Sequence, residues 1–178
     1  MNAHCMQTHS GRVVDLSKLS EDDIDIKDIA HALAHLVRFT GHANRPYSVA
    51  QHSMLVADLC PDEHRLWGLM HDASEAYLGD VSTPLKSLLP DYREIEERTQ
   101  KIIAGRFGLC WPMPSDVKIA DREALMIEKM DLFDKAIPWP GDFPPRHNKQ
   151  VRSVLNAESA KWLFVEMFKE LAVEKYRR

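Results

Sequence analysis

The most informative segment of the chain is HDASEAYLGDVSTPLK, which runs from His71 to Lys86. On a helix, His71 and Glu75 stand four positions apart and Asp72 and Glu75 stand three apart, so the three side chains approach one face. A neutral imidazole beside a carboxylate suits a divalent transition-metal cation such as Mn, Co, Fe or Zn. Because two adjacent ligands do not complete a coordination shell, further ligands must come from other helices.

Two more polar residues stand on helical stripes that are otherwise apolar. His52 shares its stripe with Val49 and Val56, where an imidazole is an unusual choice for packing alone. Asp121 is surrounded by apolar residues at positions 117, 120, 124 and 125. A buried carboxylate without a partner costs several kcal/mol, so a cation is a sensible partner for it. These two side chains are therefore candidates for the missing ligands.

Apolar residues recur at helical spacing along most of the chain. The expected helices cover residues 26–37, a segment capped by Ser48 and stopped by Pro61, residues 62–78, a segment from Asp91 to Gly105 or Gly108, residues 115–136, and a final segment from Asn156. Gly79 is the expected C-cap of the third helix. Residues 38–46 and 138–148 indicate loops. Since no long alternating pattern predicts a strand, we expect an all-α fold in which residues 1–178 form a single domain.

The composition is that of an ordinary globular protein without a strongly charged surface. The 178 residues are 44% hydrophobic and 28% charged, with a formal net charge of −4. Such a chain is a poor partner for duplex nucleic acid, although a locally positive pocket still accepts a small anionic substrate. Cys5, Cys60 and Cys110 form no CxxC pair, which favours a reducing, cytoplasmic location. Without a signal sequence or an apolar run of about 20 residues, we expect no association with a membrane.

The order His52, His71-Asp72 and Asp121 on successive helices resembles the HD phosphohydrolase superfamily, which is named for that His-Asp pair. The likeness extends to RF at 38–39, YSVAQHS at 47–53, HDASE at 71–75, GD at 79–80 and TPLK at 83–86, as in 5'-deoxynucleotidases. The same motifs are similar to small prophage-encoded HD hydrolases and to phage dATP triphosphohydrolases. The resemblance covers roughly residues 25–125, and it implies an HD-type helical bundle with a motif-bearing core at about 25–137.

The resemblance implies a metal-binding role for four residues. His52, His71, Asp72 and Asp121 would bind one divalent metal ion, with Mn, Co, Zn, Fe and Mg as the candidates. Two-metal HD oxygenases and some cyclic-dinucleotide phosphodiesterases have extra histidine ligands after the HD pair. No histidine lies between Asp72 and His147 in this chain, which favours a single metal ion.

The resemblance also implies substrate-binding and catalytic residues. Arg38 and Lys86 would hold phosphate oxygens, the arginine by its fork and the lysine as a point charge. Glu75 and Asp80 would position or deprotonate the attacking water, or protonate the leaving group. Phe39 departs from the 5'-deoxynucleotidases, which carry a tryptophan here that is pressed against the sugar and rejects a 2'-hydroxyl. The phenylalanine fills similar space but lacks the indole N–H.

The expected function is therefore metal-dependent hydrolysis of a 2'-deoxyribonucleotide, which is a small-molecule substrate. The enzyme would be a dNMP 5'-nucleotidase or a triphosphohydrolase of dNTPs, dATP among them, and the sequence leaves the base open. One alternative is an HD phosphoesterase for another nucleotide, such as ppGpp or a cyclic nucleotide. Another is a nucleotide-binding module without activity, although every expected catalytic position is filled. Because relatives assemble as dimers or larger rings, we expect a homo-oligomer.

A second pair of histidines has ligand-like spacing in a different context. His31 and His35 stand four positions apart, a spacing that can bind metal, but the resemblance puts no ligand on this first helix. We therefore expect no metal there. The start of the chain, with His4 and His9, is expected to be mobile.

Overall fold

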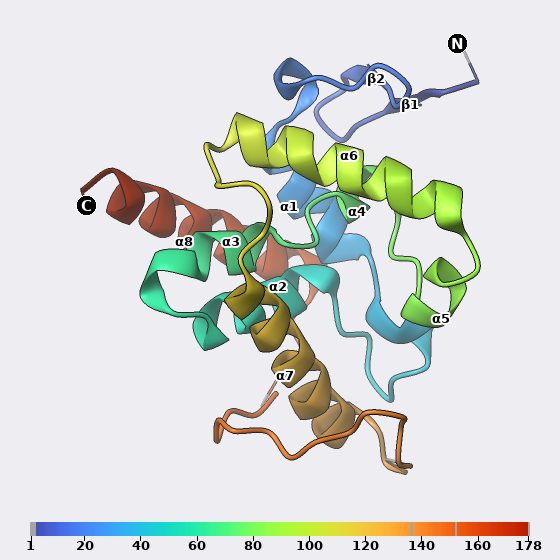
Figure 1. Ribbon diagram of the computed structural model, residues 1–178, viewed down its shortest axis with the longest axis vertical. Helices are drawn as coiled ribbons and strands as arrows, with labels where there is room; N and C mark the ends of the chain where they lie inside the picture. The colour runs from blue at the N-terminus through green and yellow to red at the C-terminus, as the bar shows by residue number, and fades with distance from the viewer. Residues whose placement is uncertain (1–2, 136, 152, 178) are drawn as a thin grey trace.

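The computed structural model describes residues 3–135, 137–151 and 153–177, and the regular structure in these ranges is mainly helical (Figure 1). The helices are α1 (Ile26–His35), α2 (Val49–Leu59), α3 (Arg65–Met70), α4 (Glu75–Leu78), α5 (Thr83–Lys86), α6 (Pro90–Arg106), α7 (Ser115–Leu132) and α8 (Ala157–Arg177). Short 3₁₀ helices occupy Glu21–Asp23, Arg38–Gly41 and Asp62–His64. The predicted all-α fold is confirmed.

A small hairpin precedes the helices, where we expected a mobile start. Strands β1 (Cys5–Gln7) and β2 (Val13–Asp15) pair antiparallel. The turn is tied to α1 because Ser10 donates to Asp28 through its backbone N–H (2.7 Å) and its hydroxyl (2.8 Å). Val14 is buried in the core. Each strand has only three residues, which is too short to produce a recognisable alternation of polar and apolar side chains.

Helix α2 occupies the centre of the molecule. It packs against α1, α3, α7 and α8. One hydrophobic cluster includes Leu33 of α1 and Phe164 of α8, and a second includes Val56 of α2 and Ile127 of α7. Figure 1 shows α6 crossing near the hairpin and α7 running toward the loop that follows it. A polar side chain on the inner face of α2 is therefore enclosed from several sides.

The ends of several helices follow local sequence signals. The Ser48 hydroxyl accepts a hydrogen bond from the backbone N–H of Gln51 (3.2 Å), which confirms the predicted cap of α2. Gly79 ends α4 with a φ of 82°, as expected for a glycine C-cap. In contrast, α6 begins at Pro90 rather than being capped by Asp91, because proline is favoured in the first helical position.

Two helices are shorter than their apolar patterns predict. Helix α1 ends at His35 instead of residue 37, since Leu36 is extended and caps it. Helix α7 ends at Leu132, and Phe133 is extended with a φ of −123°. The expected end of this helix, Ala136, lies outside the described residues.

The expected helix over residues 62–78 is interrupted by a side chain from α6. In an unbroken helix the N–H of Ser74 would bond the carbonyl of Met70 four positions earlier. Instead, Gln100 accepts from the Ser74 N–H (3.0 Å) and donates to the Met70 carbonyl (2.7 Å). The inserted amide separates the two backbone groups and breaks the helix into α3 and α4. The His-Asp pair consequently lies in a turn between them.

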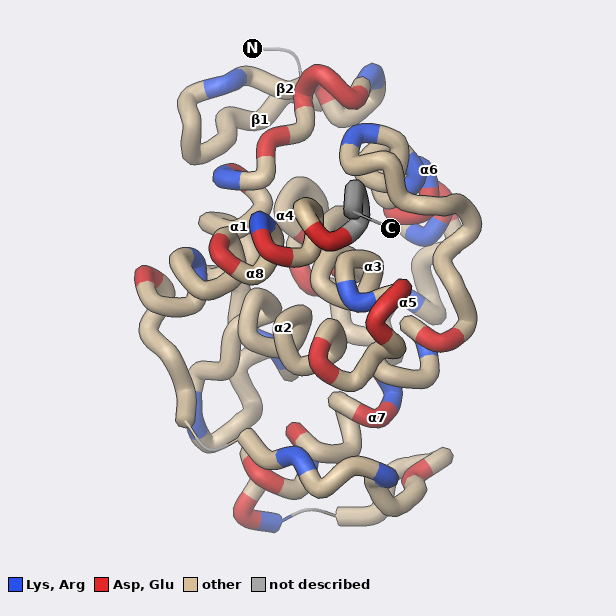
Figure 2. Tube along the Cα trace, turned by 90° about the vertical axis from the view of Figure 1, so that its left-hand side faces the viewer, with Lys and Arg blue, Asp and Glu red and all other residues tan. Residues whose placement is uncertain are grey.

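Charged residues are distributed over the whole molecule. Figure 2 shows acidic and basic residues interspersed along the chain, without a region of one sign. Some opposite charges are neighbours on one helix, as in the pair of Lys169 and Glu166 (2.6 Å). Within the described ranges, no helix has the length and apolar character needed to cross a membrane.

Candidate functional site

His52 is held in a defined orientation by a residue of α7. Its side chain is fully buried on α2, and Nδ1 lies 2.6 Å from Oε1 of Glu128. A carboxylate oxygen accepts, so Nδ1 must donate the hydrogen. In the neutral imidazole the lone pair is then on Nε2, which points away from Glu128.

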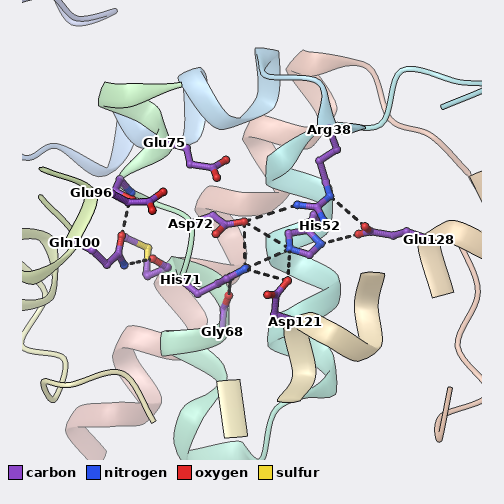
Figure 3. A network of polar contacts seen from close by, with 12 residues as sticks. Arg38, His52, Gly68, His71, Asp72, Glu75, Glu96, Gln100, Asp121 and Glu128 are labelled. Atoms are coloured by element: carbon purple, nitrogen blue, oxygen red, sulfur yellow. Dashed lines mark hydrogen bonds and ion pairs between the residues drawn. The ribbon is translucent and has the colours of Figure 1, made fainter. Parts of the chain in front are cut away.

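His71 is oriented in the same way by the backbone. Its Nδ1 donates to the carbonyl oxygen of Gly68, one helical turn earlier, at 2.7 Å. Nε2 of His71 therefore also carries the lone pair in the neutral ring. It lies 3.2 Å from Nε2 of His52, so the two acceptor atoms face each other (Figure 3).

The structure brings two carboxylates to the same point. Oδ2 of Asp72 lies 3.2 Å from Nε2 of His71 and 3.5 Å from Nε2 of His52. Oδ1 of Asp121, on α7, lies 3.1 Å from Nε2 of His52 and 3.8 Å from Nε2 of His71. The four side chains that the resemblance implied as ligands thus meet, although they come from α2, the α3–α4 turn and α7.

The chemistry of this donor set fits a divalent metal ion. Two neutral imidazoles cannot hydrogen-bond through two Nε2 lone pairs, so a proton or a cation must lie between them. Metal–nitrogen bonds of about 2.1 Å place neighbouring ligands about 3.0 Å apart in an octahedral shell and about 3.4 Å apart in a tetrahedral one. The ligand atoms of His52, His71 and Asp72 all lie within 4.8 Å of one another. This cluster could therefore hold a metal ion.

The electrostatics of the cluster favour positive charge. Burial lowers the pKa of His71, but the charge of Asp72 and a hydrogen bond with Asp121 outweigh it and hold this pKa well above its ordinary value. Burial raises the pKa of Asp121, but hydrogen bonds with both histidines lower it well below the ordinary value. In the metal-free protein this balance favours protons on the histidines, with which a metal ion would compete.

Glu75 differs from the carboxylates of the cluster because its surroundings favour the protonated form. Burial, followed by the charges of Asp72 and Asp80, raises the pKa of Glu75 to about 9. Its Oε1 lies 3.4 Å from Nζ of Lys86, which is also 2.5 Å from Glu96. Its Oε2 has no hydrogen-bond partner among the described residues. Lys86, which we expected to bind the substrate phosphate, thus contacts Glu75 and Glu96 in this structure.

Arg38 lies beside the cluster at the start of the 3₁₀ helix. Its Nε donates to Oε2 of Glu128 at 3.0 Å, and one terminal nitrogen lies 3.8 Å from Asp72. This places the guanidinium next to the cluster, where the resemblance implied phosphate binding. Asp80 is half-buried after α4, and burial raises its pKa while Arg38 opposes the rise.

Phe39 packs into an aromatic cluster with the segment that follows α7. Its ring centroid lies 5.2 Å from that of Phe133 in an edge-to-face contact and 6.4 Å from that of Trp139. The Arg38 guanidinium lies 5.2 Å from the Phe39 ring centroid. The aromatic surface next to the arginine is therefore built partly by residues beyond the region that the resemblance covers.

Two residues of the site were not identified from the sequence. Glu128 stands seven positions after Asp121, which puts both on the same face of α7, and that spacing was the signal. Gln100 breaks the helix at the His-Asp pair, but it lies on an ordinary polar stretch of α6 and has no sequence signal of this role.

A set of two buried imidazoles and two partly exposed carboxylates, with Nδ1 of each imidazole bonded elsewhere, defines a candidate divalent-metal centre. No family model matches the chain. Over 136 residues it is 44% identical to the uncharacterized protein YfdR of Escherichia coli K12, with 76% of each chain covered. The chain therefore belongs to the same family as YfdR.

More distant relatives extend the comparison. An uncharacterized protein of Rhodobacter capsulatus is 39% identical over 125 residues, which are 65% of this chain and 64% of that protein. A 5'-deoxynucleotidase of Photobacterium profundum is 31% identical over 91 residues, 48% of this chain. The matched region spans 39% of the 5'-deoxynucleotidase.

Proposed function

We propose that this protein is an HD-type, metal-dependent phosphohydrolase that acts on 2'-deoxyribonucleotides. His52, His71, Asp72 and Asp121 are the proposed metal ligands. The observation that carries the proposal is the pair of Nε2 atoms 3.2 Å apart, each with its Nδ1 bonded elsewhere and both facing two carboxylates. The relationship to a 5'-deoxynucleotidase supports a nucleotide as the substrate.

A bound divalent metal ion supplies Lewis acidity, which polarises a phosphoryl oxygen and lowers the pKa of water. In hydrolysis, water attacks phosphorus and loses a proton while the bond to the leaving oxygen breaks and that oxygen gains one. Glu75, with a pKa raised to about 9, carries a proton that it can donate to the leaving oxygen. Asp80, which is more exposed, is the proposed acceptor of the proton from water. Two carboxyl groups with separated environments can divide acid and base roles.

Arg38 and Lys86 are the proposed phosphate-binding residues. Nε of Arg38 is occupied by Glu128, which leaves the terminal nitrogens for a phosphate oxygen. Lys86 would exchange its contacts with Glu75 and Glu96 for the substrate phosphate. A phosphate bound between Arg38 and Lys86 would be neutralised by both side chains.

Phe39 is proposed to favour a 2'-deoxy sugar. An aromatic ring offers a 2'-hydroxyl no hydrogen-bond partner, and burying a hydroxyl unpaired costs about 1–3 kcal/mol. This range corresponds to roughly 5- to 150-fold in kcat/KM. Because phenylalanine is smaller than tryptophan, we expect the lower half of the range.

The proposal is tested with a substrate panel on protein stripped of metal and reloaded with Mn, Co or Mg. The panel contains all dNMPs, dNTPs and rNMPs together with ATP, ppGpp and a cyclic nucleotide, and the assay resolves phosphate from triphosphate. We expect metal-dependent turnover of a deoxyribonucleotide above its ribonucleotide. Turnover of ppGpp or a cyclic nucleotide alone would replace the substrate class. If no metal binds and no nucleotide is hydrolysed, the phosphohydrolase proposal is wrong.

A further inference from the structure

Glu128 is a buried carboxylate with one partner for each oxygen. The residue is 0% exposed on α7. Oε1 lies 2.6 Å from Nδ1 of His52, and Oε2 lies 3.0 Å from Nε of Arg38. Figure 3 shows Glu128 on the side of His52 that faces away from His71, and the Arg38 guanidinium between Glu128 and Asp72. The carboxylate thus bonds both a proposed metal ligand, His52, and a proposed phosphate-binding residue, Arg38.

The contact with His52 determines which imidazole nitrogen faces the cluster. A carboxylate that accepts from Nδ1–H fixes the tautomer and the ring orientation, and it makes Nε2 a better metal ligand. Nothing else among the described residues hydrogen-bonds this Nδ1. For His71 the carbonyl of Gly68 has the same role, so only His52 depends on a side chain for its orientation.

The contact with Arg38 holds its guanidinium at Nε and so fixes the orientation of the group. Arg38 donates to Glu128 through Nε, and one of its terminal nitrogens lies 3.8 Å from Asp72 of the cluster. A guanidinium held at Nε loses less conformational entropy when it binds a phosphate oxygen. The orientation of this side chain therefore depends on the same carboxylate as that of His52.

We propose that Glu128 is a positioning residue that orients His52 for the metal ion and Arg38 for the substrate phosphate, so that one substitution weakens both kinds of binding. This inference rests on the proposed function of the site. It adds a residue that neither the sequence motifs nor the proposed ligand set contains.

Glu123 offers a matched control on the same helix. It is 2% exposed, and its Oε1 accepts from the backbone N–H groups of Arg146 (2.8 Å) and His147 (2.7 Å). It anchors the loop after α7, and the hydrogen bonds of its Oε1 go to Arg146 and His147 of that loop. The substitutions Glu123→Gln and Glu128→Gln therefore make the same chemical change in equally buried positions, but only one of them lies behind the site.

The test measures binding of Co(II) to the metal-free full chain by calorimetry and by the visible absorption of the cobalt complex. Glutamine has one acceptor oxygen, so Glu128→Gln keeps at most one of the two hydrogen bonds. We expect the Kd for cobalt to rise by about 10- to 100-fold, as for other outer partners of metal-ligating histidines, with a changed absorption spectrum. Glu123→Gln should keep the wild-type Kd and spectrum even if its Tm is lower.

Steady-state kinetics with the best nucleotide of the panel, at saturating metal, test the second half of the proposal. Glu128→Gln should raise KM, and the increase should vanish when the substitution is made in an Arg38→Ala background, because the two residues act through one contact. The conservative variant Glu128→Asp keeps the charge and should recover part of the cobalt affinity. If Glu128→Gln does not fold by circular dichroism, Glu128→Asp becomes the deciding variant and should bind cobalt more weakly than wild type.

The outcomes separate this inference from the function on which it rests. A wild-type Kd, spectrum and KM in the folded Glu128 variant would overturn the positioning role while leaving the metal centre in place. An equal loss of cobalt affinity in Glu123→Gln would also overturn it, because the effect would then be general destabilisation. If the wild-type protein binds neither cobalt nor another metal of the panel and hydrolyses no nucleotide, the proposed function itself fails, and this inference fails with it.

Discussion

Two groups of histidines lie in this molecule, one between α2, α7 and the α3–α4 turn and the other between the hairpin and α1. In the second group the rings of His9 and His31 are parallel, with centroids 3.5 Å apart and an interplanar angle of 6°. His35 follows at 4.2 Å from His31. In the first group His52 and His71 are 5.1 Å apart and tilted by 59°. Stacked rings direct their nitrogens sideways, whereas the tilted rings direct Nε2 toward a shared point.

The difference shows that spacing brings histidines together but their other hydrogen bonds orient them. Nδ1 of His52 and Nδ1 of His71 each have an acceptor. In the second group Nδ1 of His35 bonds the carbonyl of His31 (2.7 Å), but Nδ1 of His31 is buried and has no hydrogen-bond partner in the described part of the chain. The carboxylates Asp72 and Asp121 face the first group. A helical spacing of four residues is therefore a weak predictor of a metal site without a partner for the second ring nitrogen.

The largest expected contrast is in metal binding. His71→Ala and Asp121→Ala each remove a proposed ligand. We expect metal affinity and turnover to fall by more than the 10- to 100-fold typical of losing a residue that only hydrogen-bonds a ligand. His31→Ala and His35→Ala should keep the wild-type stoichiometry. Equilibrium dialysis followed by elemental analysis measures all four variants, with circular dichroism to check folding. Wild-type metal content in His71→Ala would remove that residue from the site.

Next to the first group, substitution of Glu75 should lower turnover without removing the metal ion. Glu75 adjoins the His-Asp pair but is not needed as a ligand, so Glu75→Gln should keep its metal. We expect kcat to fall by at least about 10²-fold, the usual scale for a general acid–base group. Metal content and single-turnover kinetics are measured on the same preparation. Nearly normal turnover would show that this carboxyl is structural.

Metal affinity should rise with pH at the first group. The pKa of His71 is held well above its ordinary value in the metal-free protein, so at neutral pH a metal ion must displace a proton. Each displaced proton contributes at most about a tenfold change in Kd per pH unit. Calorimetric titration with Co(II) at pH 6, 7 and 8 should therefore give a decreasing Kd. A Kd independent of pH would contradict the assignment of a proton to this histidine.

The smallest expected effects are opposite pH dependences of stability in the metal-free protein. Burial, His35 and His9 lower the pKa of His31 below 6.5, so the unfolded chain binds this proton first and stability falls as pH decreases below 6.5. The folded protein binds the Glu75 proton up to about pH 9, against 4.5 for the ordinary carboxyl, so stability falls as pH rises between these values.

Thermal unfolding in a chelator from pH 5 to pH 9 measures both slopes, which should be at most about 5 °C in Tm per pH unit. His31→Gln should reduce the dependence of Tm on pH below 6.5. Glu75→Gln should reduce the dependence of Tm on pH at alkaline pH and raise Tm there. Unchanged slopes in both variants would show that neither group titrates differently in the folded protein.

The sequence predicted the helices of the bundle well because their apolar faces are long and periodic. It also indicated residues that the structure brings together, since Asp121 stands out on an apolar face. It did not predict the break before Glu75, because the cause is Gln100, which is distant along the chain. The spacing of Glu128 from Asp121 indicates a shared face of α7 but not its partners His52 and Arg38, which lie 76 and 90 residues earlier.

The backbone directly after Arg38 is strained. Phe39 and Thr40 have φ angles of 58° and 52°, in the left-handed region that residues with a Cβ rarely adopt. Each costs of the order of 1–3 kcal/mol, which is released when the segment opens. The loop is closed by backbone bonds from Arg38 to Tyr47 (2.9 Å) and from Asn44 to Leu132 (2.9 Å). We therefore expect its amides to exchange hydrogen with solvent faster than those of α2, and the proposed substrate to enter and leave beside this loop while the central helix stays folded.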